Sequence, residues 1–211
     1  MDHQPFCDLW PSAVRKRFDQ LQHKGSWNDS GGKGTMLWGD ARRNLNELPN
    51  SCQLDLILLD AFSPSRCPQL WSEEFLGRLA ERLAPGGRLL TYCRAAAVRS
   101  SLRRAGLVLR SLLPAPGARA EWSSGTMAVK PLDTERVAMD GPGWTSLSPM
   151  EEEHLQTRAS VPYRDPGGDD AARVIQQRRQ LEQQSCALES TSAWQRRWME
   201  PASRRPCSTN R

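Results

Sequence analysis

Residues 54–64 read LDLILLDAFSP, and this stretch decides the fold class. Its first six positions, which are apolar except for Asp55, form a run that is bounded on both sides by turn residues. A short run of this kind is typical of a strand buried on both faces, as in a parallel sheet. We therefore expect a central strand at 54–59, with Asp60 at its carboxyl end.

Helices and strands alternate on both sides of this strand. Upstream, the patterns predict an amphipathic helix at 5–23, a loop at 28–34, a strand at 35–38 and a helix at 41–48. Downstream, they predict helices at 71–83 and 95–105, strands at 88–93 and 107–113, and a hairpin at 119–129 that ends in a strand at 126–129. This alternation favours an α/β domain with a mostly parallel sheet.

The composition changes after Pro131. The chain has 211 residues and 38% hydrophobic residues, which is low for a fully packed domain of this length. The deficit lies in residues 132–211, so we expect a weakly structured, Pro/Gly-rich and basic tail there, with one helix at about 169–184. Residues 171–211 hold eight Arg and three Glu, which equals the whole net charge of +5. Such a tail attracts phosphates, or it is a solvated terminus.

Several classes of protein are disfavoured. The six Cys show no CxxC pair and no His at ligand spacing, so we expect free thiols in a reducing cytoplasm, without a metal site or a disulfide framework. The first ten residues lack the basic and apolar regions of a secretory signal. No apolar run approaches the ~20 residues that span a membrane.

Ligands of open parallel sheets bind outside the carboxyl ends of the strands. Four candidate groups lie at the ends of predicted strands here: Asp40, Asp60, the pair Tyr92 and Arg94, and the loop at 117–125 that precedes the last strand. Asp40 precedes a helix, so an N-cap and a ligand contact are equally good interpretations of this residue.

Asp60 is harder to explain as a cap, because Pro64 and Pro68 keep the following chain in a loop. A carboxylate beside the ring of Phe62 could hold a base or an amine next to a methyl donor. The alternative is a buried turn with Phe62 in the core.

Residues 60–106, from DAFSPSRCPQLW through PGG, TYC and AAAVR to AGL, carry a series of motifs in order. Together with Gly39-Asp40-Ala41 and the loop GARAEWSSG at 117–125, they resemble the MnmC-type tRNA methyltransferase family. The resemblance covers about residues 35–130. The segments at 147–151 and 162–166 also resemble the stand-alone methyltransferases of that family.

The resemblance implies a Rossmann-like methyltransferase that uses S-adenosyl-L-methionine and acts on the aminomethyl group of a tRNA wobble uridine. Asp60 would be the catalytic acid/base and would also contact the cofactor, and Phe62 would stack on the pyrimidine. Asp40 would bind the adenine of the cofactor. The implied substrate contacts are Phe62, Tyr92, Arg99, Arg119 and Glu121, with Arg99 and Arg119 as candidates for tRNA phosphates. Ala120 departs from the family's Arg.

The resemblance also implies a sheet that lacks its first two strands, as in an N-terminally truncated member. The family's sheet runs in the order 3-2-1-4-5-7-6. The glycine-rich stretch at 31–34 leads into a strand and not a helix, so it is not a cofactor loop. We expect an N-terminal helix and linker at 1–34, a partial methyltransferase domain at 35–131, and an unpaired edge on the strand at 54–59.

Two other functions remain open from the residues. The chain could be a noncatalytic tRNA-binding or interaction remnant that uses its basic tail, or a different α/β enzyme, although it has no phosphate loop and no nucleophile elbow. His154 is expected to be solvated, Trp194 and Trp198 to form a small helical contact, and Cys67 and Cys93 to be structural thiols.

The lack of a glycine-rich cofactor loop yields a first prediction. We expect the purified 211-residue chain to bind S-adenosyl-L-methionine poorly, because the loop that carries the methionine end of the cofactor in this fold is not recognisable. Isothermal titration calorimetry measures this directly, and tight binding would refute the prediction.

Overall fold

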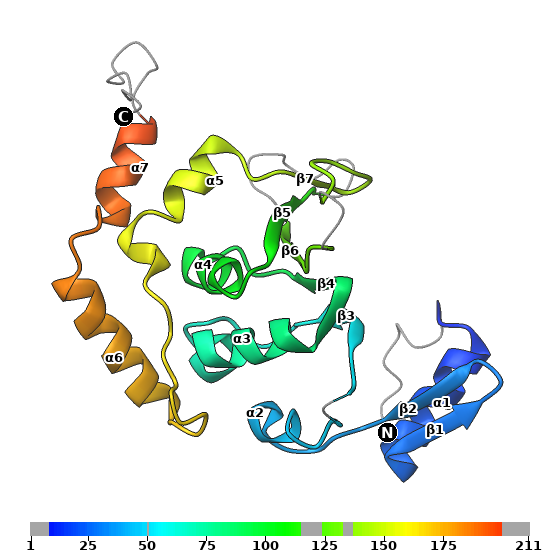
Figure 1. The fold of residues 1–211 in the computed structure, drawn as a ribbon. Helices are drawn as coiled ribbons and strands as arrows, with labels where there is room; N and C mark the ends of the chain where they lie inside the picture. The colour runs from blue at the N-terminus through cyan, green and yellow to red at the C-terminus, as the bar shows by residue number, and fades with distance from the viewer. Residues whose placement is uncertain (1–8, 50, 115–123, 133–136, 200–211) are drawn as a thin grey trace. The chain divides into compact units, whose positions relative to one another are not determined.

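The computed structural model describes residues 9–49, 51–114, 124–132 and 137–199, which form two compact units at 1–48 and 49–211. Figure 1 shows the elements of each unit. The boundary falls near Pro49, beyond the predicted linker at 1–34, so residues 35–48 belong to the smaller unit.

The smaller unit contains helix α1 (Ser12–Lys24), an antiparallel hairpin of β1 (Ser26–Asp29) and β2 (Gly32–Thr35), and the short helix α2 (Ala41–Asn44). The loop predicted at 28–34 and the strand predicted at 35–38 are therefore wrong. The turn forms because Asp29 accepts a hydrogen bond from the Gly31 amide at 2.7 Å, and Gly32 adopts a φ of +137° that favours glycine. Arg17 pairs with Asp29 at 2.8 Å and ties α1 to this turn.

The larger unit is built on a five-stranded sheet in the order β3-β4-β6-β5-β7. Its strands are β3 (Leu54–Leu58), β4 (Leu83–Thr91), β5 (Val108–Leu112), β6 (Gly125–Val129) and β7 (Trp144–Thr145). Only β3 and β4 pair in parallel, and the other three pairs are antiparallel. The expected mostly parallel sheet is thus a mixed sheet, whose first four strands follow the 4-5-7-6 half of the expected order.

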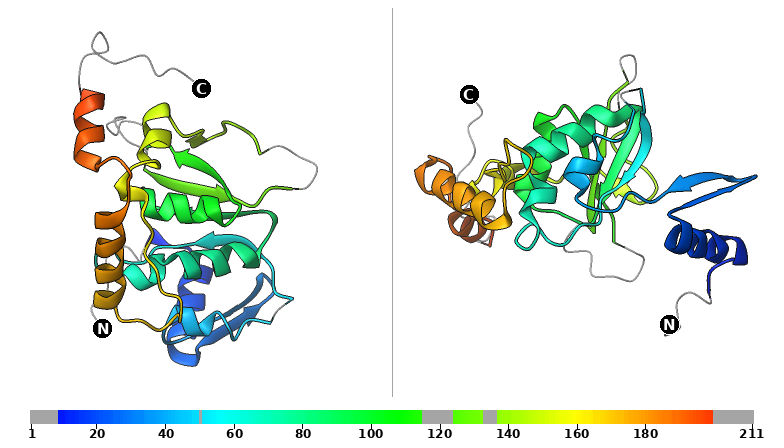
Figure 2. Two further views of the ribbon diagram at one scale, coloured as in Figure 1. Left: turned by 60° about the vertical axis from the view of Figure 1, so that its left-hand side comes forward. Right: turned by 90° about the horizontal axis from the view of Figure 1, so that it is seen from below.

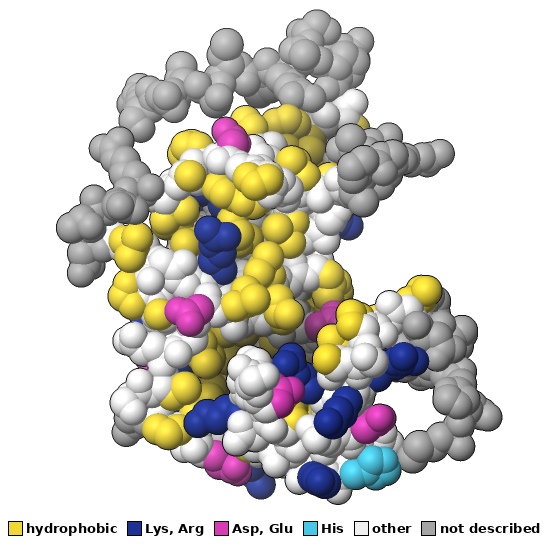
Figure 3. All heavy atoms as spheres, turned by 90° about the vertical axis from the view of Figure 1, so that its right-hand side faces the viewer, with side chains coloured by type: hydrophobic (Ala, Val, Ile, Leu, Met, Phe, Trp, Pro, Cys, Tyr) yellow, Lys and Arg dark blue, Asp and Glu magenta, His cyan; other side chains and the backbone are white. Residues whose placement is uncertain are grey.

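Strand β3 ends the sheet among the described residues. It pairs with β4 on one side only, as expected, yet it is not buried on both faces: Leu56 is 53% exposed and Leu58 is 72% exposed. Figure 3 views the side on which β3 lies in Figure 1 and shows hydrophobic side chains gathered on that surface. An apolar run of this kind is typical of a strand that is covered on both faces. In this structure, however, the run forms a strand at the edge of the sheet.

Helices α3 (Glu73–Arg82) and α4 (Ala96–Arg104) lie beside the sheet (Figure 1). Ser72 caps α3 by accepting a hydrogen bond from the Phe75 amide, and the 3-10 turn η2 (Pro68–Trp71) precedes it. Helix α4 is buried from Ala96 through Leu102, polar positions included. Burial all round means that α4 is covered on more than its sheet-facing side.

The C-terminal segment supplies that cover, and it corrects the expectation of a weakly structured tail at 132–211. It contains β7, which joins the sheet beside β5. After β7 come α5 (Pro149–His154), the 3-10 turn η3 (Arg158–Ser160), α6 (Ala172–Ser185) and α7 (Thr191–Met199), which are arranged along the helix layer (Figures 1 and 2). Ile175 and Trp194 are 0% and 1% exposed. The helix predicted at 169–184 is confirmed as α6.

Polar contacts help to attach this segment. Arg164 pairs with both Glu73 of α3 and Glu182 of α6, and the Asp165 amide donates to Glu74 at 2.7 Å. The fraction of hydrophobic residues does not predict an interface of this kind, because it takes no account of ion pairs and hydrogen bonds. Within the described ranges, no helix has the length and apolar character needed to cross a lipid bilayer.

The exposed edge of β3 generates a prediction on self-association. Replacing Leu58→Lys should reduce aggregation without loss of stability, because the side chain is largely exposed and a lysine on an edge strand opposes strand addition. Light scattering during concentration and thermal melting measure the two effects. As a control, Leu89→Lys on β4, where Leu89 is 0% exposed, should unfold the unit. Undiminished aggregation of the Leu58→Lys variant would contradict this assignment of the edge.

Candidate active site

The loop that follows β3 carries the predicted Asp60. The Leu59 amide still donates to the Leu90 carbonyl of β4 at 2.9 Å, and the chain then leaves the sheet. Ser63 starts a turn by accepting hydrogen bonds from the amides of Arg66 and Cys67 at 2.8 and 2.9 Å. No helix starts directly after Asp60, as expected from the prolines, so its carboxylate is not used as a helix cap.

Two aromatic side chains fix the backbone of this loop. The Tyr92 hydroxyl donates to the Ala61 carbonyl at 2.7 Å, and Trp71 Nε1 donates to the Phe62 carbonyl at 2.6 Å. The rings of Trp71 and Tyr92 meet edge to face, with centroids 6.1 Å apart, and Trp71 is fully buried. The end of β4 and the turn η2 therefore hold the backbone on which Asp60 and Phe62 stand.

The side chains of the loop face outward. Asp60 is exposed, and within the described part of the chain its carboxylate accepts no hydrogen bond and joins no ion pair. Phe62 is 69% exposed, so the alternative of a core phenylalanine is wrong. The Arg66 guanidinium lies 5.2 Å from the centre of the Phe62 ring, within the range of a cation–π contact. The site thus offers a carboxylate and an aromatic face to a ligand.

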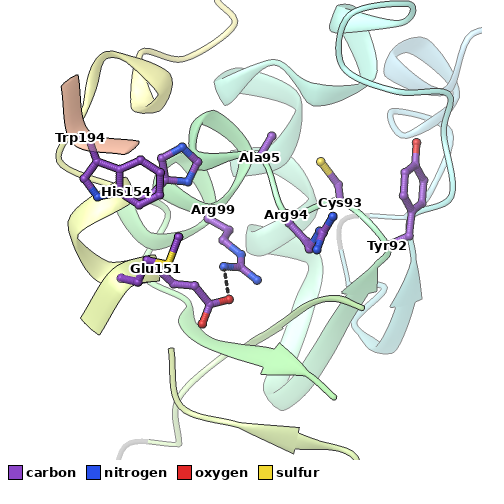
Figure 4. Close-up of a pocket in the computed structure, with 9 residues that line it drawn as sticks. Tyr92, Cys93, Arg94, Ala95, Arg99, Glu151, His154 and Trp194 are labelled. Carbon is purple, nitrogen blue, oxygen red and sulfur yellow. Dashed lines mark hydrogen bonds and ion pairs between the residues drawn. The ribbon is translucent and has the colours of Figure 1, made fainter. Parts of the chain in front are cut away.

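A cavity of about 470 Å³ adjoins this loop through Tyr92 (Figure 4). Its lining comes from the end of β4, from α4, from α5 and from α7, namely Tyr92, Cys93, Arg94, Ala95, Arg99, Met150, Glu151, His154 and Trp194. Burial raises the pKa of the Tyr92 hydroxyl, and the charge of nearby Asp60 raises it further, so this tyrosine stays a hydrogen-bond donor at neutral pH.

Arg99 and Glu151 form a buried ion pair in the wall of the cavity. Arg99 Nη1 lies 2.8 Å from Glu151 Oε1, and their side chains are 3% and 16% exposed. Arg99 also donates to the Thr126 hydroxyl at 2.8 Å and to the Gly125 carbonyl at 3.1 Å. A guanidinium that is this buried and engaged does not fit the expected tRNA phosphate contact, so we assign Arg99 a structural role.

Several groups set the charge of Glu151. Burial alone would raise its pKa, but hydrogen bonds from the Ser111 hydroxyl, the Ser148 amide and Arg99, together with the charge of Arg99, lower it to about 2. Glu151 therefore stays ionised through the ordinary pH range, and the ion pair with Arg99 persists.

The expectation that His154 is solvated is wrong, because its side chain is half-buried. Its ring stacks on Trp194 with centroids 4.5 Å apart and planes tilted by 17°. Burial lowers the pKa of His154 and the nearby Arg99 charge lowers it further, so the imidazole is neutral at pH 7. Figure 4 shows this stacked pair at one side of the cavity and Tyr92 at the other.

Cys93 and the second tryptophan behave as expected, and the expectation for Cys67 stays a prediction. Cys93 is 5% exposed and burial raises the pKa of its thiol, which fits a structural cysteine. Trp198 donates from Nε1 to Glu153 Oε2 at 2.9 Å, which joins α7 to α5. The two tryptophans of α7 thus make the small helical contact that their spacing indicated.

Asp40 lies in the smaller unit and caps α2. Its Oδ1 accepts from the Arg42 amide at 2.9 Å, and its Oδ2 pairs with Arg42 Nη2 at 2.7 Å. The hydrogen bond from the Arg42 side chain is the main reason why the pKa of Asp40 lies below its ordinary value. The cap, one of the two interpretations from the sequence, is therefore present, and an adenine contact would have to share the carboxylate with Arg42.

The predicted site residues thus separate into groups. The structure brings Asp60, Phe62 and Tyr92 together, removes Arg99 from the surface, and places Asp40 in the other unit. Arg119 and Glu121 lie outside the described residues. Sequence reasoning missed the contribution of α5 and α7 to the cavity. The family-like stretch at 147–166 was the available signal, but the tail composition pointed away from packed structure.

One acidic cluster has a structural explanation. The carboxylates of Asp165, Asp169 and Asp170 lie within 4.8 Å of one another. Asp165 accepts from the Asp170 amide at 3.0 Å, and Asp170 pairs with Arg178 at 2.9 Å. The expectation that the protein holds no metal stays a prediction.

Comparisons with known proteins agree with this arrangement. A family model described as S-adenosyl-L-methionine-dependent methyltransferase matches residues 8–128. The tRNA 5-methylaminomethyl-2-thiouridine biosynthesis bifunctional protein MnmC of Pseudomonas savastanoi is 30% identical over 158 residues, which are 71% of this chain and 24% of that protein. The protein of the same name from Ralstonia nicotianae is 42% identical over 83 residues, which are 39% of this chain and 12% of that protein.

The crystal structure of MnmC2 from Aquifex aeolicus superposes with a TM-score of 0.68 at 24% identity, over 84% of this chain and 54% of that one. This likeness supports the fold. The chain spans about a quarter of the length of the Pseudomonas relative, so that protein's whole activity does not transfer with the match.

The buried ion pair generates a prediction on acid stability. Because folding lowers the pKa of Glu151 from 4.5 to about 2, the ionised group stabilises the fold fully above pH 4.5 and loses this contribution as the pH falls toward 2. The shift corresponds to a contribution on the order of 3 kcal/mol. Glu151→Gln should lower the free energy of unfolding at pH 7 and flatten its decline between pH 5 and pH 2.

Urea unfolding at a series of pH values measures both effects. Glu152→Gln is a matched control, since Glu152 pairs with Arg103 in an exposed contact, with side chains 43% and 44% exposed, and should change stability little. Equal acid profiles for the Glu151→Gln variant and the unmodified protein would contradict the role of the pair.

Proposed function

The chain belongs to the S-adenosyl-L-methionine-dependent methyltransferases, and on this premise we propose that it methylates the aminomethyl group of a tRNA wobble uridine. The observation that carries the proposal is the exposed carboxylate of Asp60, held at the carboxyl end of β3 by the hydrogen bond from Tyr92 to Ala61. The MnmC names of the relatives support the choice of substrate. A tRNA substrate would place the reaction in the cytoplasm.

The residues of the loop fit the reacting end of the family's cofactor. When bound, S-adenosyl-L-methionine supplies an electrophilic methyl group on a sulfonium cation. An exposed carboxylate attracts a cation, so Asp60 would contact this end. The adenine contact proposed for Asp40 has less support, because Arg42 already occupies that carboxylate.

Asp60 would act on the amine of the substrate. An alkyl amine is mostly protonated at neutral pH and cannot attack a methyl group until it loses that proton. The Asp60 carboxylate would accept the proton and would also orient the nitrogen lone pair through a hydrogen bond. Its freedom from protein partners among the described residues leaves both oxygens available for this contact.

Phe62 and Tyr92 would position the nucleoside. The ring of Phe62 is 69% exposed and could stack on the pyrimidine next to Asp60. Tyr92 would act through the backbone, since its hydroxyl is committed to the Ala61 carbonyl. The substrate contacts expected for Arg119 and Glu121 stay predictions.

Replacing Asp60→Asn tests the proposal, because an amide still accepts a hydrogen bond but does not take up the proton. Transfer of tritiated methyl groups to undermodified tRNA should fall by about 10²–10⁴-fold in kcat, with little change in the KM for tRNA. The assay uses saturating S-adenosyl-L-methionine, so that weak cofactor binding does not limit the rate.

Asp55→Asn serves as the control, since Asp55 is another exposed carboxylate on β3 and should leave transfer unchanged. Equal turnover of the Asp60→Asn variant and the unmodified chain would remove the proposed mechanism. Binding of tRNA without any transfer by the unmodified chain would instead support the noncatalytic alternative.

A further inference from the structure

An exposed cation stands on the proposed active-site loop. The Arg66 guanidinium lies 5.2 Å from the centre of the Phe62 ring, and Phe62 stays 69% exposed with this guanidinium in place. Among the described residues, the guanidinium donates no hydrogen bond and joins no ion pair, not even with Asp60 on the same loop. Other arginines of the larger unit, such as Arg103 and Arg164, pair with glutamates. The charge of Arg66 is therefore left available to a ligand.

The backbone beneath this side chain is fixed. The Arg66 amide donates to the Ser63 carbonyl at 2.8 Å, which turns the chain back and brings the Arg66 side chain to the Phe62 ring. Gln176 Nε2 of α6 donates to the Ser65 carbonyl at 2.6 Å. The hydrogen bonds from Tyr92 and Trp71 hold the other end of the loop. The loop thus presents Arg66 from a set position, while the guanidinium itself is held only by the ring.

The contact with Phe62 leaves the donors of Arg66 unused. A cation–π contact draws on the charge of the guanidinium, whereas its five N–H groups point outward from the edge of its plane. This planar fork matches the oxygens of a phosphate and binds them with two parallel hydrogen bonds. Arg66 can therefore stay beside Phe62 and bind a phosphate at the same time.

The order of groups along the loop selects a nucleotide as the ligand. An unpaired carboxylate at Asp60, an exposed ring at Phe62 and an unpaired guanidinium at Arg66 follow one another. A nucleotide with an alkyl amine on its base carries the complementary set, which is an amine, a flat base and a phosphate. Each group of the loop then meets a group of opposite charge or a surface on which it can stack.

We infer that Arg66 binds a backbone phosphate of the target nucleotide, the same nucleotide whose amine meets Asp60 and whose base stacks on Phe62. This inference rests on the proposed function, because it takes the target to lie at those two residues. Phosphate contacts set the register of a nucleic acid on a protein. Arg66 would thus supply the phosphate contact for which the buried Arg99 is unsuited.

Arg66→Gln removes the charge and keeps a polar side chain. The probe is a fluorescein-labelled anticodon stem–loop with 5-aminomethyluridine at the wobble position, and fluorescence anisotropy measures its binding. In two further RNAs, a neutral methylphosphonate replaces the phosphate on the 5′ or on the 3′ side of that uridine. All RNAs carry 2′-O-methyl groups next to these linkages. For the unmodified chain, we expect the methylphosphonate on one of the two sides to weaken binding about tenfold.

In the Arg66→Gln variant, the intact RNA should bind about tenfold more weakly, and the same methylphosphonate should cause no further loss. The two changes remove one contact from opposite sides, so their effects do not add. A methylphosphonate in the stem should act equally on both proteins. Arg66→Lys should keep part of the affinity and part of the methylphosphonate effect, since it retains the charge without the planar fork.

Arg88→Gln is the matched control, because it removes the charge of another exposed arginine of the same unit. Arg88 lies on β4 opposite Leu56 and not on the active-site loop. This variant should keep the full methylphosphonate effect at the target uridine. A smaller effect in the Arg88→Gln variant as well would show that any lost positive charge reduces it, and would overturn the assignment to Arg66.

Kinetics and melting separate binding from chemistry and from folding. Arg66→Gln should raise the KM for tRNA about tenfold and change kcat by less than about twofold, which is the opposite of the pattern expected for Asp60→Asn. Its Tm should fall by no more than about 2–4 °C, because only an exposed cation–π contact is lost. Losses from Arg66→Gln and from the methylphosphonate that simply multiply would overturn the phosphate contact.

The outcomes distinguish this inference from the proposed function. Coupling between Arg66 and a phosphate of the target nucleotide without methyl transfer would keep the phosphate contact and reject the enzyme. Methyl transfer without that coupling would reject the phosphate contact alone. Absence of binding to every RNA would overturn both.

Discussion

The buried pair of Arg99 and Glu151 is the interaction on which the larger unit depends. Arg99 extends from α4 and reaches Thr126 and Gly125 of β6, Ser111 of β5 and Glu151 of α5. One guanidinium thereby joins the helix layer, two strands and the C-terminal segment. Because a buried charge is costly unless it is paired and hydrogen-bonded, these elements must assemble together. The geometry of the cavity follows from this constraint.

The two residues that follow Glu151 form further ion pairs, closer to the surface, between α5 and neighbouring helices. Glu152 pairs with Arg103 of α4 at 2.7 Å, and Glu153 pairs with Arg197 of α7 at 2.7 Å. Three consecutive glutamates of α5 thus pair with arginines of two different helices, α4 and α7. Because Glu151 is the buried one, its pair with Arg99 fixes the position of α5. The exposed pairs add little stability by themselves, but the pair of Glu153 and Arg197 joins α7 to α5, where Trp194 lines the cavity. At the opposite side, Tyr92 connects the cavity with the loop of Asp60.

Much of the larger unit could be predicted, because its elements have local signals. The strand at 54–58, the helices α3, α4 and α6, and the cap at Ser72 follow from apolar periodicity and from capping residues. The hairpin at 26–35 was missed because the glycines at positions 31, 32 and 34 suggested a loop. The packed C-terminal segment was missed because ion pairs and a few buried apolar residues such as Ile175 hold it in place. Amino-acid composition predicts neither kind of contact.

The sequence by itself determined the family, the candidate carboxylate at position 60 and the loop in which it stands, since these are encoded in contiguous residues. Only the tertiary structure decided that Leu56 and Leu58 of β3 are exposed, that Arg99 is a buried structural residue and that Trp194 lines a cavity together with Tyr92. The physical reason is distance along the chain. Arg99 and Glu151 are 52 positions apart, and no local pattern specifies which partner a charged side chain will meet when the chain folds.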